Sequence, residues 1–279
     1  MRRIEDEAVN KAIEYILNNI DRNIHPQDVA GFCHFSEYYF ERRFRKATGE
    51  SIYGFIKRSR IEQSAFRLKA ERERTVTDVG FEYGYTPSNY SSLFRKHFDE
   101  SPVAFRRKLG KKDQYRHFMT GSEFSLMSYE ECRKHITIED YDDIKVIYQR
   151  YLSNYSDMKQ DWSDFNDKYS EYICEDTQFF ERTFDDPSIT DEDRCLYDIC
   201  ISAFDGCRLD NQCLLTGGKF AVYHFSGQIE DIYPVHQSIV NVWLPQSGLM
   251  IDSRSGYDRY LIADCEKGYF VIDFCMPVK

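Results

Sequence analysis

The segment Ser36-Glu-Tyr-Tyr-Phe-Glu-Arg-Arg-Phe-Arg-Lys-Ala-Thr-Gly49 has two distinct faces when it is placed on a helix. Phe40, Phe44 and Ala47 recur at i, i+4 and i+7, which is the spacing of a core-facing stripe. A second face carries side chains that form hydrogen bonds or bear charge, namely Tyr38, Glu41, Arg42 and Arg45. Ser36 is a favourable N-cap and Gly49 a favourable stop, so we predict a short amphipathic helix.

A second short helix precedes this segment. The sequence His25-Pro26-Gln-Asp-Val-Ala-Gly-Phe32 has a proline suited to the first helical turn. Asp28 lies near the helix N-terminus, where the macrodipole favours an anion. With a tight turn at Cys33–Phe35, the two helices predict a helix-turn-helix motif whose basic second helix would enter the major groove of DNA. The alternative is a solvated amphipathic helix in a small bundle.

The same arrangement is predicted a second time further along the chain. A first helix over residues 5–20 precedes the opening motif, and a long helix from Ser51 to about Glu71 follows it. Thr75-Val-Thr-Asp78 resembles a capping box and opens another short helix. After a turn at Gly84 and Tyr85, a helix begins at Thr86-Pro87 and ends at Phe98, and a last short helix ends near Lys108. We expect the outer side of the long helix to carry the basic residues Lys57, Arg58, Arg60, Arg67 and Lys69.

Charge is distributed unevenly between the two halves of the 279-residue chain. Residues 1–112 carry 22 Lys and Arg against 16 Asp and Glu, a balance of +6. Residues 113–279 carry 15 against 31, a balance of −16. A basic half joined to an acidic half suggests a nucleic-acid-binding domain with a second domain attached. The alternative is ordinary variation of surface charge.

Several classes of protein and site are disfavoured by the sequence. No run of 18 apolar residues is present, and the N-terminus lacks the apolar core of a signal peptide, so we expect a cytoplasmic protein without a membrane span. The nine scattered cysteines contain no Cys-x-x-Cys pair, which favours reduced thiols over a disulfide framework or a zinc site. We expect no metal, no cofactor and no catalytic residues, because the seven histidines are dispersed and no nucleophile motif or phosphate loop occurs.

Residues 5–109 resemble the DNA-binding domain of the AraC/XylS family of bacterial transcription regulators. The resemblance is carried along the whole half by short motifs that include Asp28-Val-Ala30, Thr48-Gly49, Asp78-Val-Gly-Phe81, Pro87-Ser-Asn-Tyr90 and Ser101-Pro102. It implies an all-α domain with two recognition helices in successive major grooves of promoter DNA, about 10 base pairs apart.

The resemblance also implies which residues meet DNA. On the first recognition helix they are Tyr38, Glu41, Arg42 and Arg45. On the second they are Ser88, Asn89, Ser92 and Arg95. Arg42 is the best candidate for a bidentate contact to guanine. Glu41 departs from the neutral amide that is frequent in relatives; it would have to accept a hydrogen bond from a cytosine amine or pair with Arg45. We expect Lys57, Arg58 and Lys96 to anchor phosphates or to be solvated.

The second half reads as a separate α+β domain. We predict an N-terminal domain over residues 1–110, a charged linker over 111–122 and a C-terminal domain over 123–279. Strands are predicted at 144–152, 195–203, 218–225 and 268–277, with helices at 157–174 and 229–244. Short matches recur at an offset of 75 residues, such as Val146-Ile-Tyr148 with Ala221-Val-Tyr223 and Asp198-Ile-Cys-Ile201 with Asp273-Phe-Cys-Met276. Two copies of one unit suggest an internal pseudo-two-fold repeat.

Residues 123–279 also resemble a known module, the GyrI-like effector-binding domain. The most specific motif is Trp243-Leu-Pro-Gln-Ser-Gly248, and others are Ile136-Thr-Ile-Glu139, Gly217-Gly-Lys-Phe-Ala-Val222 and Met276-Pro-Val278. The resemblance implies a binding site for small molecules, often lipophilic and cationic as in multidrug-binding regulators. It places the ligand's carboxylate partner on the last strand, at Asp273.

A cation partner for Asp273 also makes chemical sense. A carboxylate in an otherwise apolar strand is costly to bury unpaired, and a bound cation among aromatic rings would compensate for that cost. The alternative is that Asp273 pairs with an arginine or with backbone amides. The candidate aromatic walls of the site, each of which could instead be core, are Trp243, Tyr148, Tyr151, Tyr155 and Tyr223.

We therefore expect a transcription regulator that binds double-stranded promoter DNA, senses a small-molecule effector and contacts RNA polymerase. Two other functions stay open for the second half. It could be a hydrolase-like enzyme that uses a carboxylate and a tyrosine, or a protein-interaction module whose acidic surface binds a basic partner.

Overall fold

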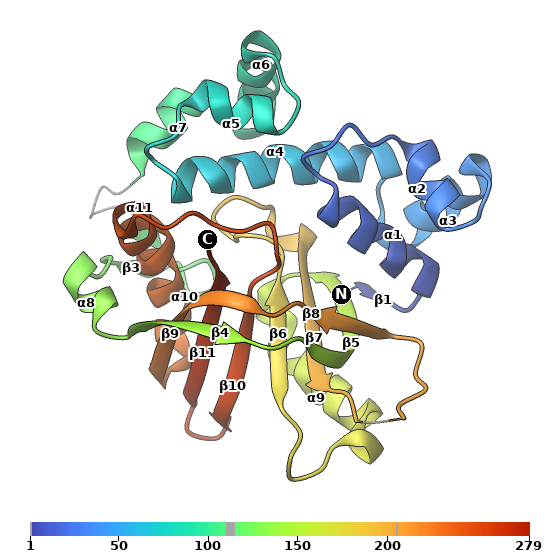
Figure 1. Ribbon diagram of the computed structural model, residues 1–279, viewed down its shortest axis with the longest axis vertical. Helices are drawn as coiled ribbons and strands as arrows, with labels where there is room; N and C mark the ends of the chain where they lie inside the picture. Colours follow the sequence, from blue (N-terminus) through green and yellow to red (C-terminus); the bar gives the residue numbers. More distant parts are fainter. Residues whose placement is uncertain (1, 110–114, 205) are drawn as a thin grey trace. The chain divides into compact units, whose positions relative to one another are not determined.

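The computed structural model of the chain describes residues 2–109, 115–204 and 206–279. Contacts divide the chain into two units, residues 2–109 and a second unit that runs from residue 110 to the C-terminus (Figure 1). The start of the predicted linker, residues 111–114, lies outside the described residues.

The first unit is helical, and its elements follow the predicted order. They are β1 (Arg2–Ile4), α1 (Glu7–Asn18), α2 (Pro26–Phe32), α3 (Glu37–Thr48), α4 (Ile52–Ala70), α5 (Val76–Glu82), α6 (Pro87–Phe98) and α7 (Pro102–Lys108). Gly49 ends α3 with a φ of +83°, in the left-handed region that favours glycine. The Ser51 hydroxyl caps α4 by accepting a hydrogen bond from the Gly54 N–H, whereas Ser36 occupies the N-cap of α3 without a side-chain cap bond.

The two helix-turn-helix units repeat each other at an offset of 50 residues. Helix α2 matches α5, and α3 matches α6, residue for residue. The turns match as well, because the Phe35 N–H donates to the Ala30 carbonyl at 3.0 Å and the Tyr85 N–H donates to the Gly80 carbonyl at 2.9 Å. The residues that reverse the chain have positive φ values, +62° at His34 and +76° at Gly84. Both recognition helices are therefore presented by the same local geometry.

The long helix α4 departs from one sequence expectation. We predicted that Arg58 and Lys69 lie on its solvated side, but both are buried, with 6% and 1% of their surface exposed. Arg58 is held between the carboxylates of Glu50 and Glu62, so its predicted role as a phosphate anchor or solvated charge is wrong. Arg60 donates instead to the carbonyls of Ile20 and Arg22, just beyond the end of α1. Arg58 and Arg60 on α4 thus bind partners within the first unit and hold its helices together.

The second unit is built on an antiparallel sheet with helices. Its strands are β4 (Ile136–Tyr141), β5 (Ile144–Ser153), β6 (Phe179–Thr183), β7 (Cys195–Ser202), β8 (Gln212–Leu215), β9 (Gly218–Gln228), β10 (Tyr257–Asp264) and β11 (Tyr269–Pro277). Within this unit the order is β5-β7-β6-β10-β11-β9-β4, and β8 pairs with β5. The helices include α8 (Tyr129–Arg133), α9 (Met158–Lys168), α10 (Ile229–Ser238) and α11 (Leu244–Ser247). The sequence pattern did not predict β4, β6, β8 and β10.

The strand order is that of two copies related by a pseudo-two-fold axis. Strands β5, β6 and β7 correspond to β9, β10 and β11, and the order β5-β7-β6 is followed by its mirror, β10-β11-β9. The copies meet where β6 pairs with β10. Helix α9 follows β5 as α10 follows β9. The predicted internal repeat is therefore visible in the sheet topology.

Two segments differ from their predicted form. Tyr115–Arg116 and Glu123–Phe124 form the strands β2 and β3 of a small hairpin, so residues 115–122 of the predicted linker consist of one short strand and the loop of that hairpin. The hairpin is ordered by packing, because the His117 ring lies 5.2 Å from the ring of Tyr233 on α10. The single helix predicted over 229–244 is interrupted by a π-helical segment (Ile239–Trp243), and Pro234 lies inside α10.

The two faces of the sheet have different surroundings. On one face α9 packs through Phe165 against a cluster that contains Tyr151 and Ile199, and His236 on α10 lies 4.0 Å from the ring of Phe274. We call this the helix face. The opposite face carries a second apolar cluster, composed of Val146, Tyr148, Phe180, Cys200, Leu215, Phe220, Val222, Tyr257 and Cys275.

Candidate functional sites

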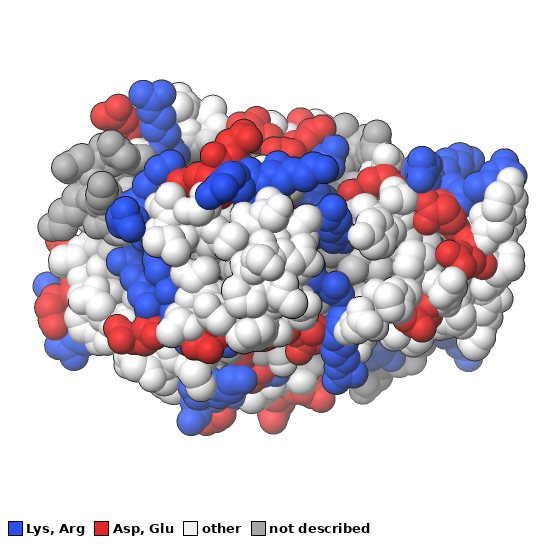
Figure 2. Space-filling model, turned by 90° about the horizontal axis from the view of Figure 1, so that it is seen from above, with Lys and Arg blue, Asp and Glu red and all other residues white. Residues whose placement is uncertain are grey.

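The polar face of α3 is available for contact. Tyr38 is 77% exposed, and Arg42 and Arg45 are also exposed, while Phe40 and Phe44 are fully buried. In Figure 2, Lys and Arg side chains lie in several groups on this face, and one of these groups lies on the side of the view where Figure 1 places α3, next to Asp and Glu side chains. A tyrosine and two arginines on one exposed helix face provide hydrogen-bond donors for bases and phosphates.

Glu41 is engaged within the unit. One carboxylate oxygen accepts a hydrogen bond from Arg45 at 3.1 Å, and the other accepts from the backbone N–H of Ile52 at 3.1 Å. The second bond caps the N-terminus of α4 and so ties α3 to that helix. Of the two partners considered for Glu41 in the sequence, the structure contains the pairing with Arg45.

The corresponding face of α6 is also exposed. Ser88, Asn89, Ser92 and Arg95 are all solvent-accessible, whereas Tyr90 and Phe94 are buried. At the 50-residue offset, Ser88 matches Tyr38, Ser92 matches Arg42 and Arg95 matches Arg45. The second helix thus offers smaller and less charged groups at the positions where the first offers a ring and a guanidinium.

Asp273 does not lie beside the helices. It faces away from α9 and α10, on the same side of β11 as Cys275, while its neighbour Phe274 packs under His236. Its carboxylate lies 2.7 Å from Nδ1 of His224, its register partner on β9. The partner of Asp273 is therefore a histidine, whereas the sequence suggested an arginine or backbone amides.

The other predicted ligand-binding residues are divided between the two faces. Tyr148 lies on the same face as Asp273. Tyr151 and Tyr155 lie on the helix face, where both stack on Tyr197. Tyr223 stacks on Phe274 and is 4% exposed. Trp243 is 4% exposed in the π-helical segment, and its indole N–H has no hydrogen-bond partner among the described residues. These residues do not form one site.

A pair of carboxylates occupies the junction of the two copies instead. Glu181 on β6 and Asp258 on β10 are direct register partners, and both belong to the helix face. The Trp162 indole of α9 donates to the Glu181 carboxylate at 3.4 Å, and the Tyr260 hydroxyl donates to it at 3.0 Å. His236 of α10 lies 3.2 Å from the Asp258 carboxylate. Each copy of the repeat thus contributes one carboxylate, and one helix that contacts it, to the site where β6 pairs with β10.

Burial makes the carboxylate pair electrostatically unusual. Only 4% of Glu181 and 8% of Asp258 is exposed. Burial, and then the charge of Asp258, raise the pKa of Glu181 to about 7. Burial works against the charged form of His236, but attraction and hydrogen bonding to Asp258 outweigh it, so the pKa of His236 is raised. Burial also raises the pKa of Tyr155 well above its ordinary value, and Glu181 contributes to that shift. Such an environment favours a bound cation.

The sequence contained only a weak signal for this pair. Glu181 lies in Phe-Phe-Glu-Arg-Thr and Asp258 in Tyr-Asp-Arg-Tyr, both short segments on strands that were not predicted. Their separation is 77 residues, so they do not align at the 75-residue offset. Neither segment alternates apolar and polar residues, and the only strand signal available was their content of phenylalanine, tyrosine and threonine.

Within residues 2–109, 115–204 and 206–279, no group of three or more metal-ligating side chains is assembled. In the same part of the chain no helix is long and apolar enough to cross a bilayer.

Comparison with protein families matches both units. Residues 29–108 match a helix-turn-helix domain, and residues 134–279 match a GyrI-like small molecule binding domain. The second match covers more than half of the chain and includes the strands that carry Glu181, Asp258 and Asp273.

Individual proteins resemble either the first unit or the whole chain. The regulatory protein SoxS of Salmonella typhimurium is 29% identical over 104 residues, which is 37% of this chain and 96% of SoxS. The right origin-binding protein of Escherichia coli is 22% identical over 269 residues, covering 91% of this chain and 90% of that protein. Among solved structures, the EcmrR C-terminal domain superposes with a TM-score of 0.43 at 10% identity, over 52% of this chain and 96% of that one.

Proposed function

The chain belongs to the family of proteins that carry a GyrI-like small molecule binding domain, here joined to an AraC-type DNA-binding domain, and from this premise we propose how it works. It binds a two-part promoter site and changes transcription in response to a small cation held by the second unit. It acts in the cytoplasm and contacts RNA polymerase when it is bound to DNA.

DNA recognition uses the exposed faces of the two recognition helices. Arg42 reads a guanine edge in the first major groove, and Tyr38 and Arg45 contact neighbouring bases or phosphates. On α6, Asn89 and Ser92 read base edges while Ser88 and Arg95 hold the backbone. Exposure of these side chains on two helices presented by matching turns supports the assignment. Glu41 ties α3 to α4 through its bond to the Ile52 N–H, and in the absence of DNA it holds Arg45, for which a DNA phosphate would compete.

The effector proposal rests on the buried pair of carboxylates, Glu181 and Asp258. Two carboxylates that are direct cross-strand partners repel each other in a site of low dielectric. A cation bound between them would relieve this repulsion, and Trp162 and Tyr260 supply adjoining aromatic rings. Effector binding would therefore draw the two copies of the repeat together. The DNA affinity of the first unit changes if the second unit acts on it differently with and without the bound cation.

Tryptophan fluorescence tests the effector site directly. Trp162 donates to Glu181, so a ligand at the pair should change its emission. We would titrate the full chain with lipophilic cations such as tetraphenylphosphonium and with neutral compounds of similar size. Saturable changes are expected for cations only. Glu181→Gln or Asp258→Asn should weaken binding by about 1–3 kcal/mol, the energy of a buried charge-assisted interaction.

Asp273→Asn provides the matched control, because it removes a carboxylate from the opposite face of the same sheet. We expect it to leave cation affinity within about twofold of the wild type. The proposal fails if Asp273→Asn abolishes binding while Glu181→Gln does not. Trp162→Phe identifies the reporting residue, since Trp243 is the other tryptophan of the chain.

A further inference from the structure

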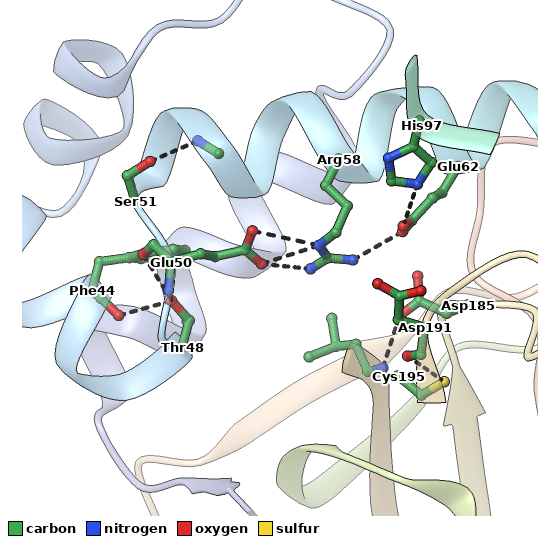
Figure 3. A network of polar contacts seen from close by, with 12 residues as sticks. Phe44, Thr48, Glu50, Ser51, Arg58, Glu62, His97, Asp185, Asp191 and Cys195 are labelled. Carbon is green, nitrogen blue, oxygen red and sulfur yellow. Dashed lines mark hydrogen bonds and ion pairs between the residues drawn. The ribbon is translucent and has the colours of Figure 1, made fainter. Parts of the chain in front are cut away.

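A chain of polar contacts joins the two helix-turn-helix units (Figure 3). It begins at Glu50, just after α3, where a carboxylate oxygen accepts from Arg58 on α4 at 2.7 Å. Arg58 also donates to Glu62, one turn further along α4, at 2.9 Å. The other oxygen of Glu62 lies 3.1 Å from Nε2 of His97, near the end of α6. The ends of both recognition helices are thus connected through α4.

The middle of this connection is buried, whereas the His97 side chain at its end is 30% exposed. The side chains of Arg58 and Glu62 are 6% and 3% exposed, so water does not offer them alternative partners. Their spacing of four residues on one helix fixes the distance between them. Buried, mutually bonded charges of this kind hold one geometry in preference to others.

The contact between Glu62 and His97 is not part of the 50-residue repeat. The pair Glu50–Arg58 has a counterpart in Glu100–Lys108, an ion pair of 2.9 Å. The residue that matches His97 in the first copy is Ala47, which has no polar side chain. Like the hydrogen bond that the Tyr90 hydroxyl donates to Ser64 at 3.1 Å, this contact joins α6 to α4 and has no counterpart in the first copy. Both contacts therefore act on the placement of α6 and not on the structure that the two copies share.

We propose that Glu62 and His97 are positioning residues that set α6 relative to α3, and thereby the spacing of the two half-sites that the protein accepts. This inference rests on the proposed DNA recognition and adds the residues that control its geometry. Successive major grooves are about 10 base pairs apart. One inserted base pair moves the second half-site by about 3.4 Å and turns it by about 34°. If α3 and α6 are held rigidly, the protein should bind a site with altered spacing weakly, and if they can move it should bind such a site nearly as well as the original one.

The test compares spacing preference among variants of the full chain. Selection from a random duplex pool with the wild-type protein supplies a two-part site, and duplexes with one base pair added or removed between its parts are then compared. We expect the wild type to prefer the selected spacing by about 10-fold or more, a typical cost of a displaced contact. His97→Ala should reduce this preference to less than about 3-fold. His97→Gln, whose amide can still donate to Glu62, should retain most of it.

Two further variants separate positioning from other effects. Lys96→Ala removes a neighbouring exposed charge and should lower the affinity for all spacings by the same factor, with a smaller salt dependence. Glu62→Gln keeps the shape of the side chain and should weaken spacing preference as His97→Ala does. The proposal is overturned if His97→Ala and Glu62→Gln, both folded by circular dichroism, keep the wild-type ratio between spacings. A wild-type chain that selects no sequence at all would instead contradict the assignment of the recognition helices.

Discussion

Asp198 and Asp273 occupy equivalent positions on the middle strands of the two copies, and each is flanked by a basic residue on both neighbouring strands. Arg150 and Arg182 are the register partners of Asp198. The partners of Asp273 are His224 and Arg259. The first triad is buried, with Asp198 and Arg150 at 0% exposure and Arg182 at 2%. In the second, the His224 side chain is 43% exposed.

This difference in burial predicts unequal effects of removing each carboxylate charge. Asp198→Asn leaves two buried guanidinium groups short of their shared counter-charge, which should destabilise the second unit by about 3–5 kcal/mol. Asp273→Asn should cost about 1 kcal/mol, because His224 can be solvated. Urea unfolding followed by tryptophan fluorescence measures both, since the two tryptophans, Trp162 and Trp243, lie in this unit. Equal losses of stability would contradict the assignment.

Stability should fall as the pH rises from about 5 to 8, because of the carboxylate pair. The pKa of Glu181 is about 7 in the folded protein, above its ordinary value of 4.5, so the folded state binds the proton more tightly than the unfolded state. That advantage is present at low pH and is lost as the pH rises through about 7. The raised pKa of His236 acts in the same direction.

Glu181→Gln should remove most of this pH dependence, which has an upper bound of about 3 kcal/mol between the two pKa values. Thermal unfolding at a series of pH values compares the variant with the wild type. Glu139→Gln is a suitable control, because Glu139 lies on β4, away from the carboxylate pair, and its pKa is lowered by hydrogen bonds from Thr137 and Tyr141. A slope of stability against pH that is the same in wild type and Glu181→Gln would refute the assignment.

Cation affinity should change with pH in the opposite sense. A proton on Glu181 competes with a bound cation, so affinity should increase as the pH rises through about 7. The increase should approach tenfold per pH unit below the pKa and level off above it. Calorimetric titration with tetraphenylphosphonium in buffers of different ionisation enthalpy would detect the proton released on binding. Binding that is independent of pH between 5.5 and 8 would exclude Glu181 as the cation's partner.

Glu41→Gln should strengthen DNA binding while weakening the fold slightly. The change removes a negative charge from the recognition face and releases Arg45 for a phosphate, so affinity should rise several-fold and depend more steeply on salt. Loss of the charged cap on α4 should cost about 1 kcal/mol. Electrophoretic mobility shifts at two salt concentrations and a thermal melt measure these effects. A loss of affinity at sites with one particular cytosine would show that Glu41 reads a base instead.

Helical patterning alone was enough to place the recognition helices. The spacing of Phe40 and Phe44, and the caps at Ser51 and Ser101, depend on residues within a few positions, so α3, α4, α6 and α7 were predictable. The outward orientation of Arg42 and Ser92 follows from the same periodicity. The burial of Arg58 did not, because its partners Glu50 and Glu62 are recognisable only once α3 has packed on α4.

In the second unit, too, some features could be predicted from the sequence and others could not. The repeat of β5 and β7 in β9 and β11 could be found in the chain itself, because similar short sequences recur at one offset. Strand pairing decides which carboxylates meet, because a shift of one residue in the pairing register moves a side chain to the other face of the sheet. Asp273 stood out by its surroundings in the sequence and faces away from the helices. Glu181 and Asp258 face each other only because β6 and β10 pair at the junction of the two copies, a contact between residues far apart in the chain.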